Sequence, residues 1–424
     1  ARLARWECSF RVGIVPPDRC NPCPAPDLLQ ISRHTARGSV TLRDSVRALA
    51  HEAGFDVARV TDAAPLSDAA AAMHARLADG HLDGMAWITE ERIVRATDPS
   101  ALLDGARSFI VMAASYWYDV PRPPDDPATP RGRVARYAWG RDYHDVLRDA
   151  ANEVASGLTR IAGRAVRIRI FVDSSPLAER AVAIRAGLGW SGKSTMVLAP
   201  GIGTYTLLAT ILTDLEIEPD APLAKSCGAC TRCIDACPTG ALVAPGVLDA
   251  RTCVSFHTIE NRGAIPMHLR PAIGEWLFGC DDCQDACPVN RRLARGRLAE
   301  LRATSVDDAW PPLLPILAMD DDAFRMRYRH TAIWRTKRRG LQRNACIVLG
   351  NLRDPIAAPA LAAVAVDPRA DHVVRGHAAW ALGRIGGAVA RDALHRVMTA
   401  EAHAATSGGE DVVAEASTAL SVCE

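Results

Sequence analysis

The sequence predicts a protein of mixed fold, α+β or α/β, in which a domain of helices and strands precedes an iron–sulfur module and C-terminal helical repeats. Three observations lead to this prediction. Helical and strand-like segments alternate up to about residue 220, eight of the 13 cysteines lie between Cys227 and Cys287, and a helical motif at 343–352 recurs at 376–385. The chain of 424 residues is long enough for two or three domains with substantial cores.

The first domain, which we assign to residues 39–221, alternates amphipathic helices with apolar strands, and this alternation is typical of an α/β layer structure. Gly54 and Gly80 follow two of the helices and mark their ends. The Pro- and Asp-rich stretch 121–132 is expected to be a loop. The expected helices are 41–53, 67–79, 145–161 and 177–186, and the expected strands are 108–114, 166–172 and 195–198.

Residues 1–38 differ from the rest of the chain. They contain Cys8, Cys20, Cys23 and several prolines, and they show no sustained hydrophobic period. Cys20 and Cys23 have the spacing of a metal-binding pair, but no partner ligands accompany them. We therefore expect a disordered extension at residues 1–38.

Charge and composition argue against several kinds of function. Lys and Arg number 50 and Asp and Glu number 49, so the net charge of +1 does not favour bulk nucleic-acid binding, and any such contact must come from a local patch. No apolar run approaches the roughly 18 residues of a membrane helix, and no signal-peptide pattern is found. Iron–sulfur thiolates need a reducing compartment, which predicts a cytoplasmic protein.

Cysteine spacing predicts two iron–sulfur clusters in a ferredoxin-like module at residues 222–295. The first run is C-x2-C-x2-C-x3-C-P, in which three cysteines hold one iron cube and the fourth ligates the other. A second run, C-x2-C-x3-C-P, and the lone Cys253 bring the thiolates to the eight that two cubes need. Structural zinc or disulfides are the alternatives, but zinc sites seldom use such a run. We assign to the first cluster Cys227, Cys230, Cys233 and Cys287, and to the second Cys237, Cys253, Cys280 and Cys283.

The C-terminal region, residues 296–424, contains a repeated helical motif behind a basic linker. Arg343–Leu352 is echoed by Gly376–Ile385, and 412–420 resembles the start of a third unit. The two segments are 33 positions apart, and a helical pair that repeats at this period is typical of a HEAT-like solenoid. A stack this short needs the preceding domains to cap it.

The glycine-rich segment Gly187–Ser194 matches the P-loop pattern G-x4-G-K-[ST] letter by letter. A P-loop needs a strand before it and a helix after it, so that backbone amides and the helix N-terminus hold phosphate. Here a helical segment precedes the motif and a strand-like segment follows it, so we reject nucleotide hydrolysis. We expect the glycines to let a different cofactor approach the backbone closely.

Several long motifs resemble those of the epoxyqueuosine reductase family. The matching segments are 136–144, 172–181, 186–193, 273–288 and 331–351, and the resemblance extends from about Leu42 to the helical repeats. It implies a nitroreductase-like cobalamin-binding domain, two [4Fe–4S] clusters and a tRNA substrate. The implied reaction is reduction of the epoxide of epoxyqueuosine to queuosine at the anticodon wobble position.

Asp173 is the catalytic residue that the resemblance implies, as proton donor. It lies at the expected end of strand 166–172, where α/β folds place ligands. Removing the epoxide oxygen as water takes two electrons and two protons, so a carboxylic acid is needed near the cofactor, and we expect an apolar cofactor face to raise its pKa. The residues by themselves leave a second interpretation open, in which Asp173 only caps the following helix.

The resemblance also implies cobalamin held base-off, as cob(II)alamin, without a ligand from the protein. Cobalamin proteins that supply a histidine usually carry D-x-H-x-x-G; Asp142-Tyr143-His144 begins in this way, but Leu147 replaces the glycine. The clusters would pass electrons to the cofactor one at a time. The predicted cofactor contacts are Arg95, Arg136, Asp173, Lys193, Ser194, Ser255, Cys280 and Asp281.

Basic residues interleaved with aromatic ones predict an RNA-binding surface. Arg325, Arg327 and Arg329 alternate with Met326 and Tyr328, and further basic residues lead into the first repeat. Such interleaving suits phosphates and unstacked anticodon-loop bases. A basic run is often only a solvated face, but its place beside the solenoid and the family match favour RNA. The predicted tRNA contacts are Arg262, Lys337, Arg338, Arg339 and Arg343.

Other functions fit the sequence less well. The main alternative is a reductive dehalogenase-like corrinoid iron–sulfur enzyme that acts on a small molecule, but such enzymes usually carry an export signal and lack helical repeats. An electron carrier would not need Asp173 or the glycine-rich segment, and two repeats offer too little surface for a scaffold. The expected partners are tRNA and a cytoplasmic electron donor such as flavodoxin or ferredoxin, with no membrane, and we expect a monomer.

Overall fold

The computed structural model describes residues 41–401 and 409–423. The predicted extension at residues 1–38, with its three cysteines, lies outside the described residues. The described chain begins with α1 (Leu42–Glu52), which Thr41 caps: its side chain accepts a hydrogen bond from the Asp44 backbone, and the Asp44 side chain accepts one from the Thr41 backbone. This reciprocal pair fixes the start of the helix that the sequence predicts.

A four-stranded sheet forms the centre of the first domain, with strand order β1-β2-β7-β4 and antiparallel pairing between all neighbours. Antiparallel pairing makes the domain α+β, so the rule that places ligands at the carboxyl ends of parallel strands does not apply to Asp173. The strands of this sheet are β1 (Val57–Asp62), β2 (Ser108–Ser115), β4 (Ile168–Phe171) and β7 (Thr206–Thr213).

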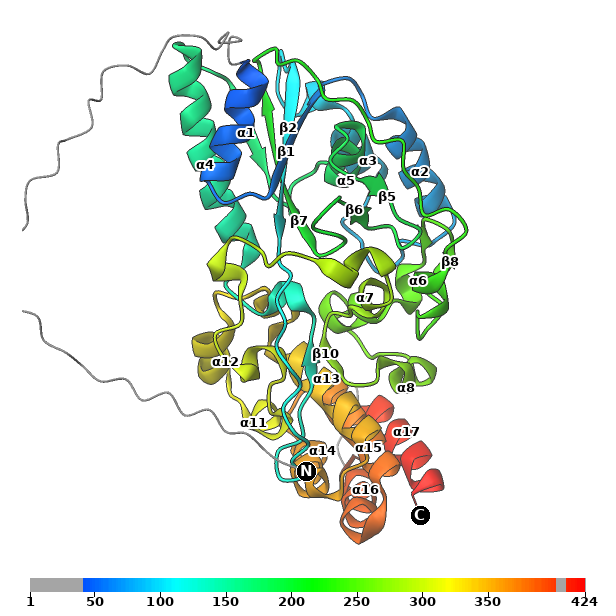
Figure 1. Cartoon of the computed structure of the whole chain (residues 1–424). Helices are drawn as coiled ribbons and strands as arrows, with labels where there is room; N and C mark the ends of the chain where they lie inside the picture. The colour runs from blue at the N-terminus through cyan, green and yellow to red at the C-terminus, as the bar shows by residue number, and fades with distance from the viewer. Residues whose placement is uncertain (1–40, 402–408, 424) are drawn as a thin grey trace, which may run out of the picture. The chain divides into compact units, whose positions relative to one another are not determined.

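Helices cover both faces of this sheet, which explains why β2 is buried along its whole length (Figure 1). Side chains alternate along β2, so Ile110 and Met112 face one apolar core while Phe109 and Val111 face another. The first core is closed by α1 and α4 (Tyr143–Ala162), and the second by α5 (Glu179–Arg185). The remaining helices of this domain are α2 (Ser67–Ala78) and α3 (Glu90–Thr97).

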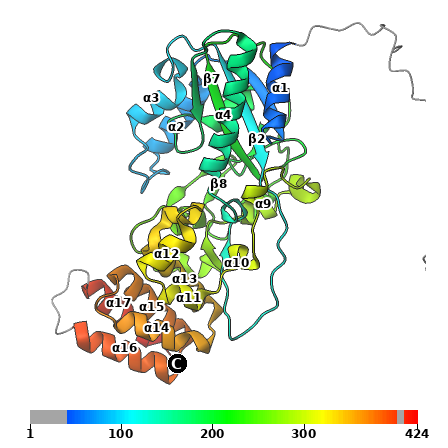
Figure 2. The ribbon, with the colours of Figure 1, turned by 90° about the vertical axis from the view of Figure 1, so that its left-hand side faces the viewer.

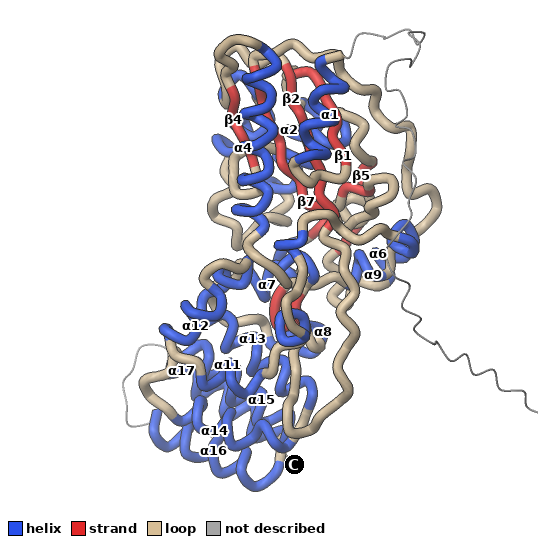
Figure 3. Tube along the Cα trace, turned by 60° about the vertical axis from the view of Figure 1, so that its left-hand side comes forward, coloured by secondary structure: helices blue, strands red, loops and turns tan. Residues whose placement is uncertain are grey.

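The cysteine-rich module consists of short elements. The helices α6 and α9 lie side by side (Figure 3), and β10 extends the module by pairing in parallel with β3 of the first domain. Its elements are α6 (Arg232–Asp235), β8 (Leu242–Ala244), β9 (Val247–Leu248), α7 (Val254–Ile259), α8 (Arg270–Ile273), β10 (Trp276–Phe278) and α9 (Asp282–Asp285), with β3 at Arg133–Val134.

The C-terminal helices form two rows, with α13, α15 and α17 in one and α14 and α16 in the other (Figure 2). The predicted repeat is confirmed: Arg343–Leu352 lies in α13 and Gly376–Ile385 in α15. The first row packs on the cysteine-rich module through contacts of α13 with α7, α8 and β10. The helices are α10 (Val306–Ala309), α11 (Leu313–Ala318), α12 (Asp321–Tyr328), α13 (Lys337–Leu352), α14 (Ala358–Val366), α15 (His372–Ile385), α16 (Gly387–Glu401) and α17 (Gly409–Val422).

A glycine at the same place in each repeat lets these helices approach closely. A Cβ atom on Gly350 of α13 would lie 2.9 Å from the Cα of Ala381 in α15. The equivalent Gly383 of α15 meets the Cα of Ala419 in α17 at 2.8 Å. Both distances are below any real Cβ contact, so close packing explains the repeated glycine.

The described residues, 41–401 and 409–423, form one compact unit by their contacts, so the proposed limits at 221/222 and 295/296 stay predictions. Among the described helices, none combines the length and apolar character that a membrane span requires.

Candidate active site and iron–sulfur centres

Asp173 lies just beyond β4 on a bend where its backbone adopts a φ of 49°. This left-handed conformation is uncommon for residues other than glycine, although Asp tolerates it better than most. Oδ2 of Asp173 accepts a hydrogen bond from the Tyr143 hydroxyl at 2.5 Å and lies 3.4 Å from Nε2 of His144. The side chain is 66% exposed. Because α5 begins at Glu179 after Ala178, Asp173 does not cap it, and the capping alternative fails.

His144 is held between two carboxylates. Its Nδ1 lies 2.8 Å from Asp142, and its Nε2 faces Asp173. Burial opposes the charged imidazole, but the two carboxylates outweigh burial and raise the pKa of His144 to about 9. The Asp173 side chain is exposed, yet the surrounding protein partly desolvates it and disfavours its charged form; hydrogen bonds from His144 and Tyr143 outweigh this and lower the pKa of the carboxyl. Near neutral pH the proton is therefore on His144. The expected rise in the pKa of Asp173 requires an apolar cofactor face beside it and stays a prediction.

Glu179 supports the Asp173 bend from the protein interior. Its side chain is buried, and Oε2 accepts a hydrogen bond from the backbone N–H of Asp173 at 2.6 Å. Its Oε1 is buried beside the hydroxyl of Thr210. Burial and the Asp173 carboxylate raise the pKa of Glu179 to about 8. This role of Glu179 is not visible in the sequence, because a Glu at the start of a helix is ordinary.

Aromatic rings connect the Asp173 site to the cysteine-rich module. The Tyr137 ring lies edge-on to that of Tyr143, with centroids 5.7 Å apart, and 6.1 Å from that of Phe278 in β10. Burial, with the charges of Asp173 and Asp281, raises the pKa of Tyr137 well above its usual value. Tyr137 is therefore a neutral side chain within electrostatic reach of both regions.

Two predicted cofactor contacts, Arg136 and Asp281, are paired with each other. The Asp281 side chain is 1% exposed and accepts hydrogen bonds from the Arg136 backbone at 2.9 Å and from its guanidinium at 3.2 Å. Burial raises the pKa of Asp281 to about 6, although Arg136 opposes this rise. Nε of Arg136 is buried without a partner. The pair fastens the first domain to the cluster module.

The other predicted cofactor contacts, apart from Asp173 and Cys280, have polar side chains that make no hydrogen bond or ion pair with the described protein. These four are Arg95, Lys193, Ser194 and Ser255. Arg95 is exposed on α3, and the neighbouring Ala96 carbonyl accepts a hydrogen bond from the Ala178 backbone at 2.9 Å, which connects α3 to the Asp173 bend. The Cys280 thiol donates to Asp282 at 3.4 Å.

The glycine-rich segment does not have the context of a P-loop. Helix α5 precedes it, and the hairpin of β5 (Trp190–Ser191) and β6 (Val197–Leu198) follows, as the sequence predicts. A Cβ on Gly187 would lie 2.1 Å from the carbonyl oxygen of Ala221, and one on Gly189 would lie 2.6 Å from that of Leu198. The expectation that these two glycines admit a cofactor is therefore wrong, because the protein's own backbone fills the space.

The first predicted cluster set is gathered where α6 meets α9. Its four thiols are free and partly exposed. Burial raises the pKa of Cys233, and Cys227 and Cys287 add to the rise. Burial likewise raises the pKa of Cys287, with contributions from Cys227 and Cys230. Cys233 and Cys287 are thus both close enough to other members of their predicted set to be influenced by them.

The second predicted set shows the same pattern. Burial raises the pKa of Cys280 strongly, and Cys283 and Cys253 add to the rise. Burial also raises the pKa of Cys283, with contributions from Cys253, Cys237 and, in the first set, Cys233, so the two sets adjoin. No three metal-binding side chains of the described residues converge tightly enough for one metal ion.

Four of the five predicted RNA contacts reach the surface. Lys337 lies over the Trp334 ring at 4.8 Å, and Arg338 binds Asp321 at 2.6 Å. Arg339 donates a hydrogen bond to the Arg262 carbonyl, which joins α13 to the loop after α7. The surface residues of the predicted set are Arg262, Lys337, Arg338 and Arg339.

Arg343 is the exception, because it is 1% exposed. Its guanidinium donates to the carbonyl oxygens of His257, Asn261 and Gly263 at 2.6, 2.8 and 2.8 Å. Burial lowers the pKa of Arg343 to about 9. The prediction that Arg343 contacts tRNA is therefore wrong; the side chain holds the 257–263 segment in place.

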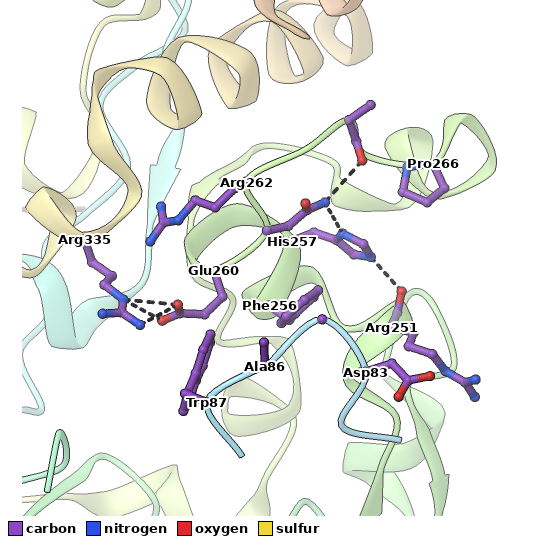
Figure 4. Close-up of a pocket in the computed structure, with 13 residues that line it drawn as sticks. Asp83, Ala86, Trp87, Arg251, Phe256, His257, Glu260, Arg262, Pro266 and Arg335 are labelled. Atoms are coloured by element: carbon purple, nitrogen blue, oxygen red, sulfur yellow. Dashed lines mark hydrogen bonds and ion pairs between the residues drawn. The ribbon is translucent and has the colours of Figure 1, made fainter. Parts of the chain in front are cut away.

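A pocket of about 550 Å³ opens between the 83–87 loop, α7 and the 332–336 turn (Figure 4). Arg335 binds Glu260 through two nitrogens, at 3.0 and 2.8 Å, and lies over the Trp87 ring at 5.5 Å. Arg262 lines the same pocket. The Arg335 pKa is raised mainly by Glu260, with a smaller contribution from Asp173, so the pocket lies within electrostatic reach of Asp173.

Comparison with known proteins identifies the family. The model for epoxyqueuosine reductase QueG, DUF1730, matches residues 96–174, a 4Fe-4S double cluster binding domain matches 226–290, and HEAT repeats match 331–406. The chain is 38% identical to the epoxyqueuosine reductase of Bacillus subtilis over 328 residues, which cover 76% of this chain and 82% of that protein. The chain belongs to the epoxyqueuosine reductase family. An epoxyqueuosine reductase from Staphylococcus aureus is 36% identical, over 84% of this chain and 91% of its own length.

Solved structures of epoxyqueuosine reductases have the same fold. One, with an epoxyqueuosine-modified tRNA-Tyr stem loop, matches with a TM-score of 0.83 and 32% identity, over 90% of this chain and 99% of that one. Another, from Streptococcus thermophilus, matches with a TM-score of 0.80 and 30% identity, over 90% and 98%. The chain is therefore an oxidoreductase of this family, with an iron–sulfur module and HEAT repeats.

Proposed function

We propose that this chain reduces the epoxide of epoxyqueuosine to queuosine at the wobble position of tRNA. The observation that carries the proposal is the Asp173–His144 pair, in which an exposed carboxylate lies 3.4 Å from a protonated imidazole in a protein of this family. A relative has been solved with an epoxyqueuosine-modified tRNA stem loop, which favours RNA over a small organic molecule as substrate.

We infer that base-off cob(II)alamin binds beside Asp173, as the family resemblance implies. The residues fit this group, because the polar side chains of Arg95, Lys193, Ser194 and Ser255 have no partner within the described protein and can bind its amide and phosphate groups. Both ring nitrogens of His144 face carboxylates, which suits a cofactor that takes no histidine ligand. When bound, cobalamin supplies the electron transfer to the epoxide.

We propose that the two cysteine sets hold two [4Fe–4S] clusters. The set of Cys227, Cys230, Cys233 and Cys287 holds one cluster and the set of Cys237, Cys253, Cys280 and Cys283 holds the other. The match of residues 226–290 to a 4Fe-4S double cluster binding domain supports two clusters, and the spacing of the first cysteine run supports this division. Asp281, next to Cys280, and its partner Arg136 place the second set beside the cofactor contacts.

The chain's own residues supply protons to the reaction. Converting the epoxide to an alkene consumes two electrons and two protons and releases water. His144, whose pKa of about 9 keeps it protonated at neutral pH, passes its proton to the Asp173 carboxylate, which donates it to the departing oxygen. The second proton reaches that oxygen from solvent through the exposed Asp173 carboxyl, and water leaves. Tyr143 orients the Asp173 carboxylate, and Glu179 holds its backbone.

We propose that the pocket and the adjoining basic residues bind the anticodon stem loop. Arg262, Lys337, Arg338 and Arg339 would contact phosphates, and the 40%-exposed Trp87 ring would stack on an unpaired base. The enzyme would work in the cytoplasm, because cluster thiolates need a reducing compartment. A one-electron carrier such as flavodoxin or ferredoxin would reduce it.

The test is an assay of epoxyqueuosine-containing tRNA with protein reconstituted anaerobically with iron, sulfide and cobalamin. Wild type is compared with Asp173→Asn and with Arg148→Gln, a control at an exposed position on α4. We expect product from wild type and control, and a loss of about 100-fold or more in Asp173→Asn, the scale of general acid catalysis. Equal rates would remove Asp173 from catalysis. No product from a fully loaded protein would overturn the function and make an organohalide the next substrate to assay.

A further inference from the structure

Basic residues lie close in sequence to the cysteines of the first set. Segments 222–240 and 286–296 together carry five cationic residues and one carboxylate, Asp235. Lys225, one of the five, lies over the Trp190 ring at 5.7 Å. The other four are exposed and make no hydrogen bond or ion pair with the rest of the described chain; we call them the arginine face, which consists of Arg232, Arg291, Arg292 and Arg295.

The arginine face is attached directly to the cysteines of the first set. Arg232 precedes Cys233 in α6, and Arg291 and Arg292 end the 3₁₀ helix Pro288–Arg292 that follows Cys287. With a rise of roughly 2 Å per residue, this helix keeps the Arg291 Cα within about 8 Å of that of Cys287. The charges of Arg232 and Arg291 are therefore close to the thiols that we propose hold the first cluster.

The backbone beneath the arginine face is held firmly. The buried Asn290 side chain accepts a hydrogen bond from the Thr204 backbone at 2.9 Å and donates one to the Gln284 carbonyl at 2.8 Å. Farther along, the Gly296 carbonyl accepts a hydrogen bond from the Tyr118 hydroxyl at 2.5 Å. Exposed charges on a fixed backbone present the same surface to every incoming molecule, which favours fast association.

The arginine face belongs to different elements from the predicted RNA surface. The segment that follows it packs against the first domain, where Arg297 donates to the His51 carbonyl at 3.0 Å. The RNA candidates Arg262 and Arg339 instead lie on the loop after α7 and on α13. In the view of Figure 3, α6 and α9 lie apart from α13.

We propose that the arginine face is the docking surface for a small acidic protein that carries one electron at a time. This inference rests on the proposed function and adds to it the place where electrons enter. Charge complementarity identifies the partner, because transient redox encounters use small interfaces and depend on electrostatic attraction for their rate. In each encounter the carrier loses one electron and the first cluster gains it, so two encounters supply the two electrons that the epoxide consumes.

The experiment follows cluster reduction by stopped-flow absorbance, without tRNA, so its outcome does not depend on the substrate. The probe is a reduced, small, acidic ferredoxin, at an ionic strength of about 0.01 M, where charges act over about 30 Å. The variant is Arg291→Glu/Arg292→Glu/Arg295→Glu. A control with the same change in net charge, Arg148→Glu/Arg160→Glu/Arg391→Glu, alters exposed positions away from the cysteines. Reduced methyl viologen, a small cation, serves as the second reductant.

We expect the variant to be reduced by ferredoxin at least 10-fold more slowly than wild type, with the difference shrinking as salt is added. The control variant should keep the wild-type rate, and methyl viologen should reduce all three proteins without a comparable loss. Equal ferredoxin rates in wild type and variant at low salt would overturn the proposal. An equal loss with methyl viologen would show that the arginines act on the cluster itself, which also overturns it. Weaker binding of the tRNA stem loop with unchanged ferredoxin rates would assign the face to RNA instead.

Discussion

Replacing Glu179 by glutamine should make the protein more stable, by an amount that grows with pH. The variant keeps an oxygen that can accept the hydrogen bond from Asp173 N–H, and it cannot ionise. The wild-type carboxyl has a pKa raised from 4.5 to about 8 by burial and by Asp173. Because the folded state holds this proton more tightly than the unfolded state, the ionisation of Glu179 disfavours folding as pH rises from 4.5 to about 8.

The size of this effect follows from the raised pKa. At about 1.36 kcal/mol per pKa unit, the penalty in the wild type is roughly 1.4 kcal/mol at pH 5.5 and roughly 4 kcal/mol at pH 7.5. The side chain is buried, so solvent screens this energy little. The stability difference between variant and wild type should therefore widen by about 2.5 kcal/mol across this range, or several degrees in apparent Tm.

The assay is differential scanning fluorimetry of proteins with equal iron content, at half-unit steps from pH 5.5 to 7.5. Glu153→Gln, at an exposed position of α4, is the matched control and should show a constant offset. If the Tm difference between Glu179→Gln and wild type does not change with pH, Glu179 has no raised pKa, and the proposed neutral support behind Asp173 is refuted.

Three further predictions concern other parts of the chain. Arg270→Leu should destabilise the protein by about 3–5 kcal/mol, because it leaves the Glu415 carboxylate, which Arg270 binds at 2.9 and 2.5 Å, without its partner. In chemical denaturation, the double variant with Glu415→Leu should recover most of this loss, and no recovery would contradict the pairing. The pKa of His144 is raised from 6.5 to about 9, so the stabilisation that its charge provides should be complete below pH 6.5 and disappear as pH rises through 9. The apparent Tm of His144→Asn should lack this alkaline loss, and a pH profile equal to that of wild type would count against the carboxylate pairs. Gly383→Val should lower the apparent Tm by several degrees, because the new side chain would meet the α17 backbone. Gly376→Ala should change the Tm little, because the nearest atom to a Cβ there is 3.4 Å away. Equal Tm losses in the two variants would exclude the close-packing explanation.

Local features of the sequence were sufficient for the predictions that depend on spacing. The C-x2-C-x2-C-x3-C-P run predicted the cluster module because its first three thiolates must meet one metal cube, and that constraint is local. Two other predictions are confirmed because they depend only on neighbouring residues. One is the helix that Thr41 caps, and the other is the rejection of the P-loop at Gly187–Ser194 from the order of helix and strand around it. The helical repeat was visible because each unit packs in the same way on the next.

Only the tertiary structure determined which polar groups face one another. In the sequence Arg343 is one more residue of a basic run. In the structure its guanidinium is buried and binds carbonyl oxygens of residues 80 to 86 positions away. The sequence around Gly187 predicts a cofactor loop, but in the structure the backbone of Ala221 fills the space beside this glycine.

The active site shows the same division. Asp173 could be named from a motif, but its pKa could not be predicted, because that depends on His144 and Tyr143 from another helix and on Glu179 behind it. The sequence by itself thus determined the family, the clusters and the repeats, which are recorded in the spacing of nearby residues. The tertiary structure determined where protons reside and which charges are free, because electrostatic energy depends on distance and burial rather than on order along the chain.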